Sequence, residues 1–208
     1  MKVQIKNAKL GFADIFDAKT SEFSDKAKYS AQFIVTDETK MIINGEEKTA
    51  EEIVALMQKV ITDKFGAKAG KVKNWAFCRG DGEGCARDEF TNNDGEFYFD
   101  TDADTVRFVA TKQPHTCRAS WANDKGKLML ILADKSRAVS GDINSGDIVN
   151  GFVDLFATDA GGSKSINASI GAIQLVESRG GGGSQVIDEN EFDDLSGGAG
   201  TEEVEAPF

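Results

Sequence analysis

Apolar and polar residues alternate along most of the chain, as they do in β-strands whose successive side chains point to opposite faces. The first predicted strand covers residues 3–12, and the second covers residues 28–35, where the sequence reads KYSAQFIV. Further strands are predicted at residues 75–79, 96–99, 105–111, 116–122, 127–133, 148–157 and 166–176. The loops at residues 123–126 and 159–162 are rich in Asn, Asp and Gly, so we expect hairpin turns there.

One segment, residues 49–66, has helical spacing instead of alternation. Thr49 is a good N-cap and Glu52 follows it by three residues, which is the pattern of a capping box. Gly66 suits the position that ends a helix. The apolar positions form one stripe that should pack on a sheet: Ile53, Leu56, Met57, Val60, Ile61 and Phe65.

Many short strands with a single helix predict a mainly β fold. An OB-fold-like small barrel with one amphipathic helix and extra hairpins fits this pattern, and a β-sandwich is the alternative. We expect this domain to cover residues 1–178. Four successive glycines begin at Gly180, so residues 179–186 are expected to be a linker and residues 187–208 a disordered acidic tail.

The net charge of −11 is distributed unevenly. Eight of the 35 acidic residues and none of the 24 basic residues lie in residues 180–208, which leaves residues 1–179 with a net charge of −3. A nearly neutral domain can carry a basic groove, so the total charge does not exclude a nucleic-acid partner.

The sequence contains no run of about 18 apolar residues, the length that a membrane-spanning helix needs. The first twelve residues alternate and do not resemble a signal peptide. We therefore expect a cytoplasmic protein with no membrane partner.

Aromatic residues are interleaved with basic ones, which is the combination that holds single-stranded nucleic acid by stacking and phosphate contact. On one continuous strand, the odd-numbered residues from Lys71 to Arg79 would share a face. Most of the 14 phenylalanines must belong to the core, and the tryptophans could as well. The residues predicted to contact DNA are Lys71, Lys73, Trp75, Arg79, Tyr98, Arg107, Arg118 and Trp121.

Two other chemistries are weaker alternatives. Cys78, Cys85, His115 and Cys117 could form a zinc set, but their spacing is irregular and buried cysteines are the simpler explanation. The acidic residues Asp81, Glu83, Asp88 and Glu89 could hold Mg²⁺ in a nuclease, but they fall in a glycine-rich loop. With one histidine and no motif for a nucleophile, we predict a protein that is not an enzyme and has no metal or cofactor.

The acidic tail ends in a hydrophobic tip, Pro207 and Phe208. An aromatic residue beside a free carboxylate suits capture by a pocket on a partner protein. The acidic groups could also occupy a basic groove and compete with nucleic acid. The residues predicted to bind partners are Asp193, Asp194, Glu202, Glu203, Glu205, Pro207 and Phe208.

Several segments resemble the single-stranded DNA-binding proteins of tailed phages, which include the replication protein of the T-odd coliphages. The segments are residues 28–35, 79–82, 145–151, 153–157 and 164–176. The resemblance implies an OB-fold, sequence-tolerant binding of single strands in the host cytoplasm, and an acidic tail that recruits replication proteins such as a polymerase, helicase or primase. Pro207 and Phe208 are more similar to the tail tip of bacterial single-stranded DNA-binding proteins, so the partners could be phage or host proteins. A homodimer and a replisome adaptor without strong DNA binding remain alternatives.

Overall fold

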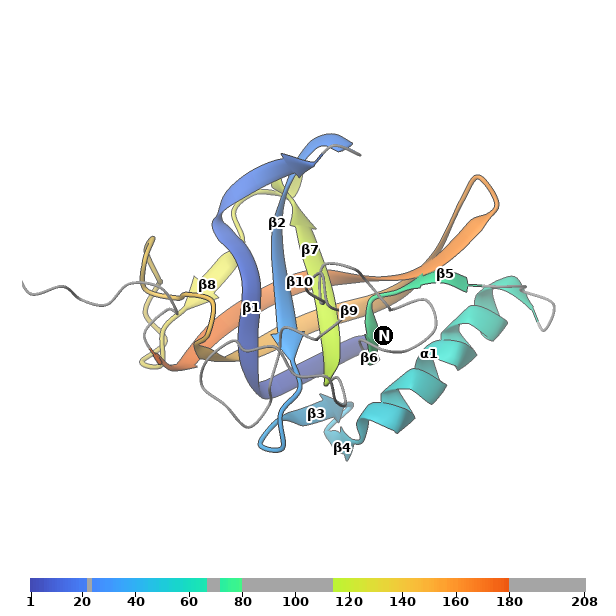
Figure 1. The fold of residues 1–208 in the computed structure, drawn as a ribbon, viewed down its shortest axis with the longest axis horizontal. Coiled ribbons are helices and arrows are strands. Elements are labelled where there is room, and N and C mark those ends of the chain that lie inside the picture. Colours follow the sequence, from blue (N-terminus) through green and yellow to red (C-terminus); the bar gives the residue numbers. More distant parts are fainter. Residues whose placement is uncertain (22–23, 67–71, 80–113, 180–208) are drawn as a thin grey trace, which may run out of the picture.

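The computed structural model describes residues 1–21, 24–66, 72–79 and 114–179 (Figure 1). The chain begins with two long strands, β1 (Lys2–Ser21) and β2 (Ser24–Ile34), followed by the short β3 (Lys40–Ile43) and β4 (Glu46–Lys48). The helix α1 (Ala50–Phe65) precedes β5 (Val72–Trp75) and β6 (Phe77–Arg79). The second half contains β7 (His115–Ala122), a short 3₁₀ helix (Asn123–Lys125), β8 (Met129–Ile131), β9 (Ile148–Ala160) and β10 (Ser163–Glu177).

Five of these strands pair in a closed ring in the order β1, β2, β7, β10, β9 and back to β1. Neighbours in the ring are antiparallel except β7 and β10, which run parallel and pair at Ser120 and Ser169. This is the five-stranded arrangement of an OB-fold. The mainly β architecture with one helix, predicted from the sequence, is confirmed.

The strand β1 closes the ring because it pairs with two neighbours along its length. Its first half pairs with β9 and β3, and its second half pairs with β2. The register shifts near Asn7 and again near Phe12, and both residues have positive φ, 54° and 41°. An extra residue in one strand bends it and increases its twist, which lets β1 pass from one side of the ring to the other.

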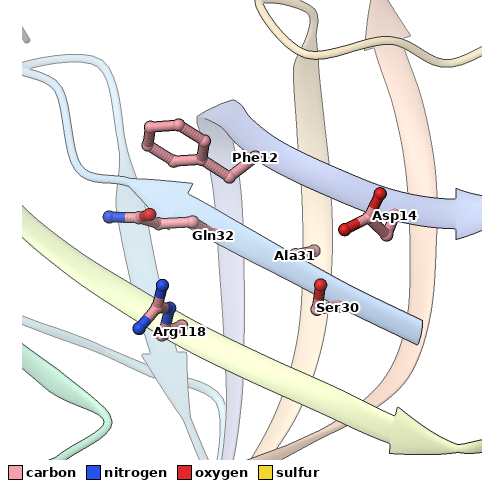
Figure 2. Close-up of a pocket in the computed structure, with 6 residues that line it drawn as sticks. All are labelled: Phe12, Asp14, Ser30, Ala31, Gln32 and Arg118. Carbon is pink, nitrogen blue, oxygen red and sulfur yellow. The ribbon is translucent and has the colours of Figure 1, made fainter. Parts of the chain in front are cut away.

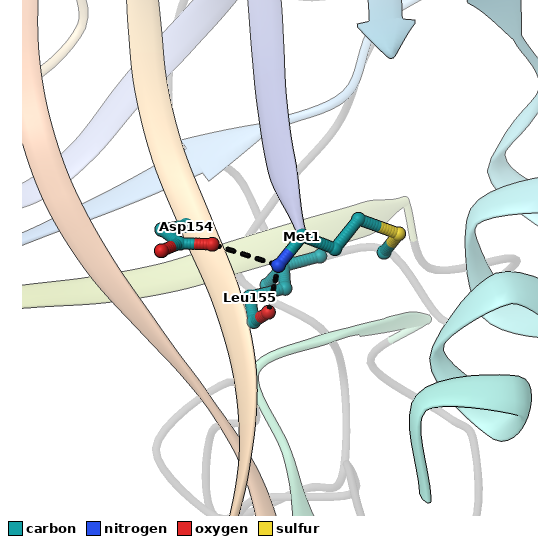
Figure 3. Close-up of polar contacts among 3 residues, drawn as sticks. All are labelled: Met1, Asp154 and Leu155. Atoms are coloured by element: carbon teal, nitrogen blue, oxygen red, sulfur yellow. Dashed lines mark hydrogen bonds and ion pairs between the residues drawn. The ribbon is translucent and has the colours of Figure 1, made fainter. Parts of the chain in front are cut away.

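The amino end of β1 is fixed to β9. The Met1 ammonium donates to the Asp154 carboxylate over 2.7 Å and to the Leu155 carbonyl over 2.6 Å, and the Leu155 amide donates back to the Met1 carbonyl (Figure 3). These contacts set the register of the long β1–β9 pairing.

The interior of the ring is apolar, and a close contact there joins β2 to β9. Phe33 is fully buried, and its ring lies directly over the backbone of Gly151. A Cβ atom at position 151 would come within 2.4 Å of the Phe33 ring, closer than any real Cβ contact. Only glycine allows the two strands to approach this closely.

The helix α1 forms as the sequence predicts. The Glu52 amide donates to the Thr49 hydroxyl and the Thr49 amide donates to the Glu52 carboxylate, so the capping box is complete. Gly66 ends the helix with φ of 78°, and its amide donates to the Thr62 carbonyl. Of the predicted stripe, Ile53, Met57 and Ile61 are fully buried and the others are partly buried.

The hairpin predicted at residues 159–162 is confirmed, since it joins β9 to β10 with Gly161 and Gly162 at positive φ. The hairpin predicted at residues 123–126 is wrong. In the described residues, β8 and β7 do not pair with each other, and both run parallel to β10. The β3–β4 hairpin was not predicted, although Asn44 and Gly45 are a strong turn signal. The strands predicted at 96–99 and 105–111 lie outside the described residues.

Substitution of Gly151 by alanine should destabilise the protein by about 1–3 kcal/mol, the usual cost of overpacking a core. The cost should shrink in a Phe33→Leu background, because the ring that the new methyl group meets is then absent. Urea unfolding of the four proteins in this double-mutant cycle measures the coupling. An equal cost of Gly151→Ala in both backgrounds would show that the Phe33 contact is not the constraint.

Candidate nucleic-acid interface

The outer face of β2 and β7 carries polar side chains. Tyr29, Ala31 and Phe33 of β2 point into the core, while Ser30 and Gln32 alternate with them on the opposite face, where Gln32 is nevertheless buried. On β7, Arg118 and Ser120 alternate with the buried Cys117 and Ala119. The register places Ser30 beside Ser120 and Gln32 beside Arg118, so the outward residues form two cross-strand rows.

A groove of about 340 Å³ runs from this face toward β10. Trp75, Asn74 and Ala76 line one part of it, and Ser30, Arg118, Ser120, Ile166 and Asn167 line the rest. Trp75 is partly buried in the groove wall. The groove therefore contains an aromatic ring, a guanidinium group and several neutral hydrogen-bonding side chains.

The position of Trp75 depends on a seam between β7 and β10. The Ala76 amide donates to the Ile166 carbonyl of β10 over 2.9 Å, and the Ala76 carbonyl accepts from the Arg118 amide of β7 over 2.8 Å. Ala76 thus connects the two parallel strands where they separate. The strand β5 on one side of it pairs with β10, and β6 on the other side pairs with β7.

A second hollow of about 280 Å³ adjoins the first and shares Ser30 and Arg118 with it. Figure 2 shows Phe12, Gln32 and Arg118 at one end of this hollow and Asp14 and Ser30 at the other. The two hollows follow one another along the β2–β7 face, and we call them together the β2–β7 groove.

Three lysines lie near the strands that form the β2–β7 groove. Lys19 lies 2.5 Å from the carboxylate of Asp14, which lines the second hollow, and the hydrogen bond and negative charge of Asp14 raise the pKa of Lys19. The ammonium groups of Lys64 and Lys164 each lie 5.6 Å from the centre of the Phe65 ring. Lys164 pairs with Val72 of β5, so this cation lies close to the strand that carries Trp75.

Among the predicted DNA contacts, Trp75 and Arg118 come together in the β2–β7 groove. Arg79 is exposed at the end of β6, opposite His115 of β7. Lys73 lies on β5, but its side chain is not among the described parts, and Lys71, Tyr98 and Arg107 lie outside the described residues.

Trp121 lies apart from Trp75. It lines a different pocket, with Lys2 and Phe152, on the side where β1, β9 and β10 meet. Its indole N–H donates to the Gly126 carbonyl, and the Lys125 ammonium lies 5.4 Å from its ring centre. The structure therefore does not bring the two tryptophans into one groove.

The expectation that Lys71 to Arg79 form one continuous strand face is wrong. The chain bends at Ala76 when it changes partner from β10 to β7, and the alternation is interrupted there. Phe77 is 1% exposed and belongs to the core, where its ring stacks on His115 at 5.6 Å. Trp75 and Phe77 therefore have different roles although they are two residues apart.

The positions of Cys78 and Cys117, the two cysteines within the described residues, do not favour a zinc site. Cys78 pairs with Thr116 of β7, so it points away from the face that carries Cys117. Burial raises the pKa of the Cys117 thiol to about 12, which keeps it from becoming the thiolate that binds a metal. No cluster of three or more His, Cys, Asp or Glu side chains suited to a metal occurs in residues 1–21, 24–66, 72–79 and 114–179. Cys85 and the acidic residues 81, 83, 88 and 89 lie outside these ranges.

Several residues that line the β2–β7 groove were not predicted from the sequence: Phe12, Ser30, Gln32, Asn74, Ser120 and Asn167. Most of them are polar residues that alternate with apolar ones in strands, a pattern that does not distinguish a groove from any other outer face. Phe12 gave no signal, because an aromatic residue in a strand is more often part of the core. The predicted partner-binding residues from Asp193 to Phe208 lie outside the described residues. In the part of the chain that the structure describes, no helix is long and apolar enough to cross a membrane.

The strands β2 and β7 are the second and third strands of the OB-fold ring. OB-fold proteins bind oligonucleotides or oligosaccharides on the face of these two strands, and the β2–β7 groove places this protein in that class. Within that class, the chain belongs to the family of the single-stranded DNA-binding protein of Enterobacter phage Enc34, whose family model matches residues 1–204.

Phage proteins are similar to this chain in sequence and in structure. Protein p50 of Acyrthosiphon pisum secondary endosymbiont phage 1 is 27% identical over 207 residues, which are 94% of this chain and 95% of that protein. The single-stranded DNA-binding protein of bacteriophage Enc34, solved in complex with single-stranded DNA, has a TM-score of 0.56 at 14% identity and covers 88% of this chain and 89% of its own. The bacteriophage T7 single-stranded DNA-binding protein gp2.5 has a TM-score of 0.45 at 13% identity, covering 92% and 96%.

Proposed function

We propose that this protein coats single-stranded DNA during phage replication and recombination, and that it acts by binding and not by catalysis. The observation that carries the proposal is the β2–β7 groove, where Trp75 and Arg118 meet on the face that OB-folds use for oligonucleotides. Membership of the Enc34 family supports the same activity.

The contents of the groove suit a strand whose bases are unpaired. Trp75 offers a flat surface for stacking, which is tolerant of sequence because every base has a π-face. The exposed Arg118 can neutralise a phosphate, and Ser30, Asn74, Ser120 and Asn167 can hydrogen-bond to sugars and bases. A duplex would keep its bases stacked inside and could not use the Trp75 surface.

The other predicted contacts are part of the proposal. Lys73 lies on β5 and Arg79 on β6, and with Lys71, Tyr98 and Arg107 they would extend the contact surface. Trp121 lies in a separate pocket and would make a weaker contact outside the groove. The proposed mode of binding is a short series of stacked bases with phosphates held by scattered cations.

Single-stranded oligonucleotides should bind more tightly than duplexes of the same sequence, and rising salt should weaken the binding because phosphate contacts release counterions. Fluorescence anisotropy with both forms at 50 mM and 200 mM salt measures this, the range over which about six to ten phosphate contacts would cost 10³–10⁵ in affinity. Equal affinity for both forms, or no binding at 50 mM salt, would contradict the proposal.

Substitution of Trp75 by leucine should weaken single-strand binding by about 1–3 kcal/mol, the usual value of one stacked base. The matched variant Trp121→Leu should lose less affinity for single strands, because Trp121 lies outside the β2–β7 groove and contacts Gly126 and Lys125 instead. Dissociation constants of the wild type and the two variants for a poly-dT oligonucleotide show which substitution weakens binding more. Wild-type affinity in Trp75→Leu would remove Trp75 from the interface.

We further propose that the acidic tail recruits phage or host replication proteins in the host cytoplasm and competes with DNA for the groove. All eight acidic residues after position 179 lie within residues 188–208. Deletion of residues 188–208 should therefore tighten DNA binding at low salt, and the gain should fade at high salt. If truncation leaves DNA affinity unchanged and removes only partner binding, the tail is an adaptor and not a competitor.

A further inference from the structure

Gln32 is the most unusual side chain of the β2–β7 groove. The residue is 1% exposed, and within the described residues neither its Oε1 nor its Nε2 has a hydrogen-bond partner. Buried polar groups are almost always hydrogen-bonded, because leaving them unpaired costs folding free energy. An apolar side chain of similar size would fill this position without that cost. The presence of an amide here therefore indicates a hydrogen-bonding partner that is not part of the protein.

The aromatic neighbour of Gln32 is held in an unusual backbone conformation. Phe12 follows Gly11, which pairs directly with Gln32, and the register shift there leaves Phe12 with φ of 41° and its side chain 52% exposed. A bulky residue rarely adopts positive φ, and such strain is concentrated at binding sites. Figure 2 shows the Phe12 ring above the Gln32 side chain and Arg118 below it.

The charges of this hollow do not suit an anion held at its centre. Asp14 lines the hollow opposite Arg118, so a carboxylate and a guanidinium face the same space. A neutral, flat group fits between them better than a phosphate. The volume of about 280 Å³ lies just below the roughly 300 Å³ at which pockets for drug-sized ligands begin.

We propose that this hollow holds one nucleobase of the bound strand, with its face on Phe12 and its pairing edge on the Gln32 amide, while Arg118 contacts the adjoining phosphate. This inference rests on the proposed function and adds a defined base site to it. The Watson–Crick edge of each DNA base presents a donor next to an acceptor. A glutamine amide presents the same pair, and rotation of the amide exchanges their order, so one side chain matches all four bases. The site is therefore specific for a base edge and tolerant of which base it is.

The test is Gln32→Leu, which removes the amide and keeps the size of the side chain. Binding to dT, dA and dC oligonucleotides should weaken about tenfold each, equal to about 1.4 kcal/mol. The melting temperature of the DNA-free protein should rise by about 2–4 °C, because a buried unpaired amide is gone. A residue with a merely structural role would not move affinity and stability in opposite directions.

Two further variants separate the possible outcomes. Gln58→Leu, on the exposed side of α1, should leave DNA affinity and melting temperature near those of the wild type. Arg118→Gln should weaken binding to all three oligonucleotides equally and reduce the salt slope by about 1. Wild-type affinity in Gln32→Leu alongside weakened Arg118→Gln overturns the base site and leaves the proposed function intact. A lower melting temperature for Gln32→Leu also overturns it, whereas a wild-type protein that binds no single strands overturns both.

Discussion

The contact of the Phe33 ring with the backbone of Gly151 is the constraint on which the ring of strands depends. It joins β2 to β9 across the interior, and these two strands are not neighbours in the sheet. Gly151 pairs with Ile5 of β1 on one side and with Ile173 of β10 on the other. The contact with Phe33 therefore lies where three neighbouring strands are paired side by side. The register shifts at Asn7 in β1 and near Gly171 in β10 fall close to this row, and they supply the bend that such a close approach requires.

The same strand that fills the core also forms the groove. Because side chains alternate along β2, fixing Phe33 inside fixes Gln32 and Ser30 outside, and the pairing with β7 then places Arg118 and Ser120 beside them. A shift of one residue would exchange the core and groove faces completely. The geometry of the groove is therefore set by packing on the opposite side of the sheet, and not by the polar residues themselves.

The bulge that exposes Phe12 is held by a hydrogen-bonded loop. The Ala13 amide donates to the Ser145 hydroxyl, and Leu10 exchanges backbone hydrogen bonds with Gly146 and Asp147. The Asp147 side chain is fully buried, and it accepts from the amides of Asn144 and Arg179 and from the Ser178 hydroxyl. A strained residue persists only when its surroundings over-determine it, and this network provides that condition. It also connects Ser178 and Arg179, which follow β10, to the bulge that carries Phe12.

The sequence predicted the parts of the fold that local signals determine. Thr49, Glu52 and Gly66 were enough for α1, and Gly161 and Gly162 were enough for the β9–β10 hairpin. It could not predict the change of partner at Ala76, because that depends on where β7 and β10 separate in space. For this reason Trp75 and Phe77 looked equivalent in the sequence, although one lines the groove and the other fills the core.

The parallel pair β7–β10 closes the ring at Ser120 and Ser169, and Ala76 supplies hydrogen bonds to both strands beyond it. The hydrogen bonds that position Trp75 are therefore made to the same two strands that close the ring, so the β2–β7 groove depends on the closure of the fold.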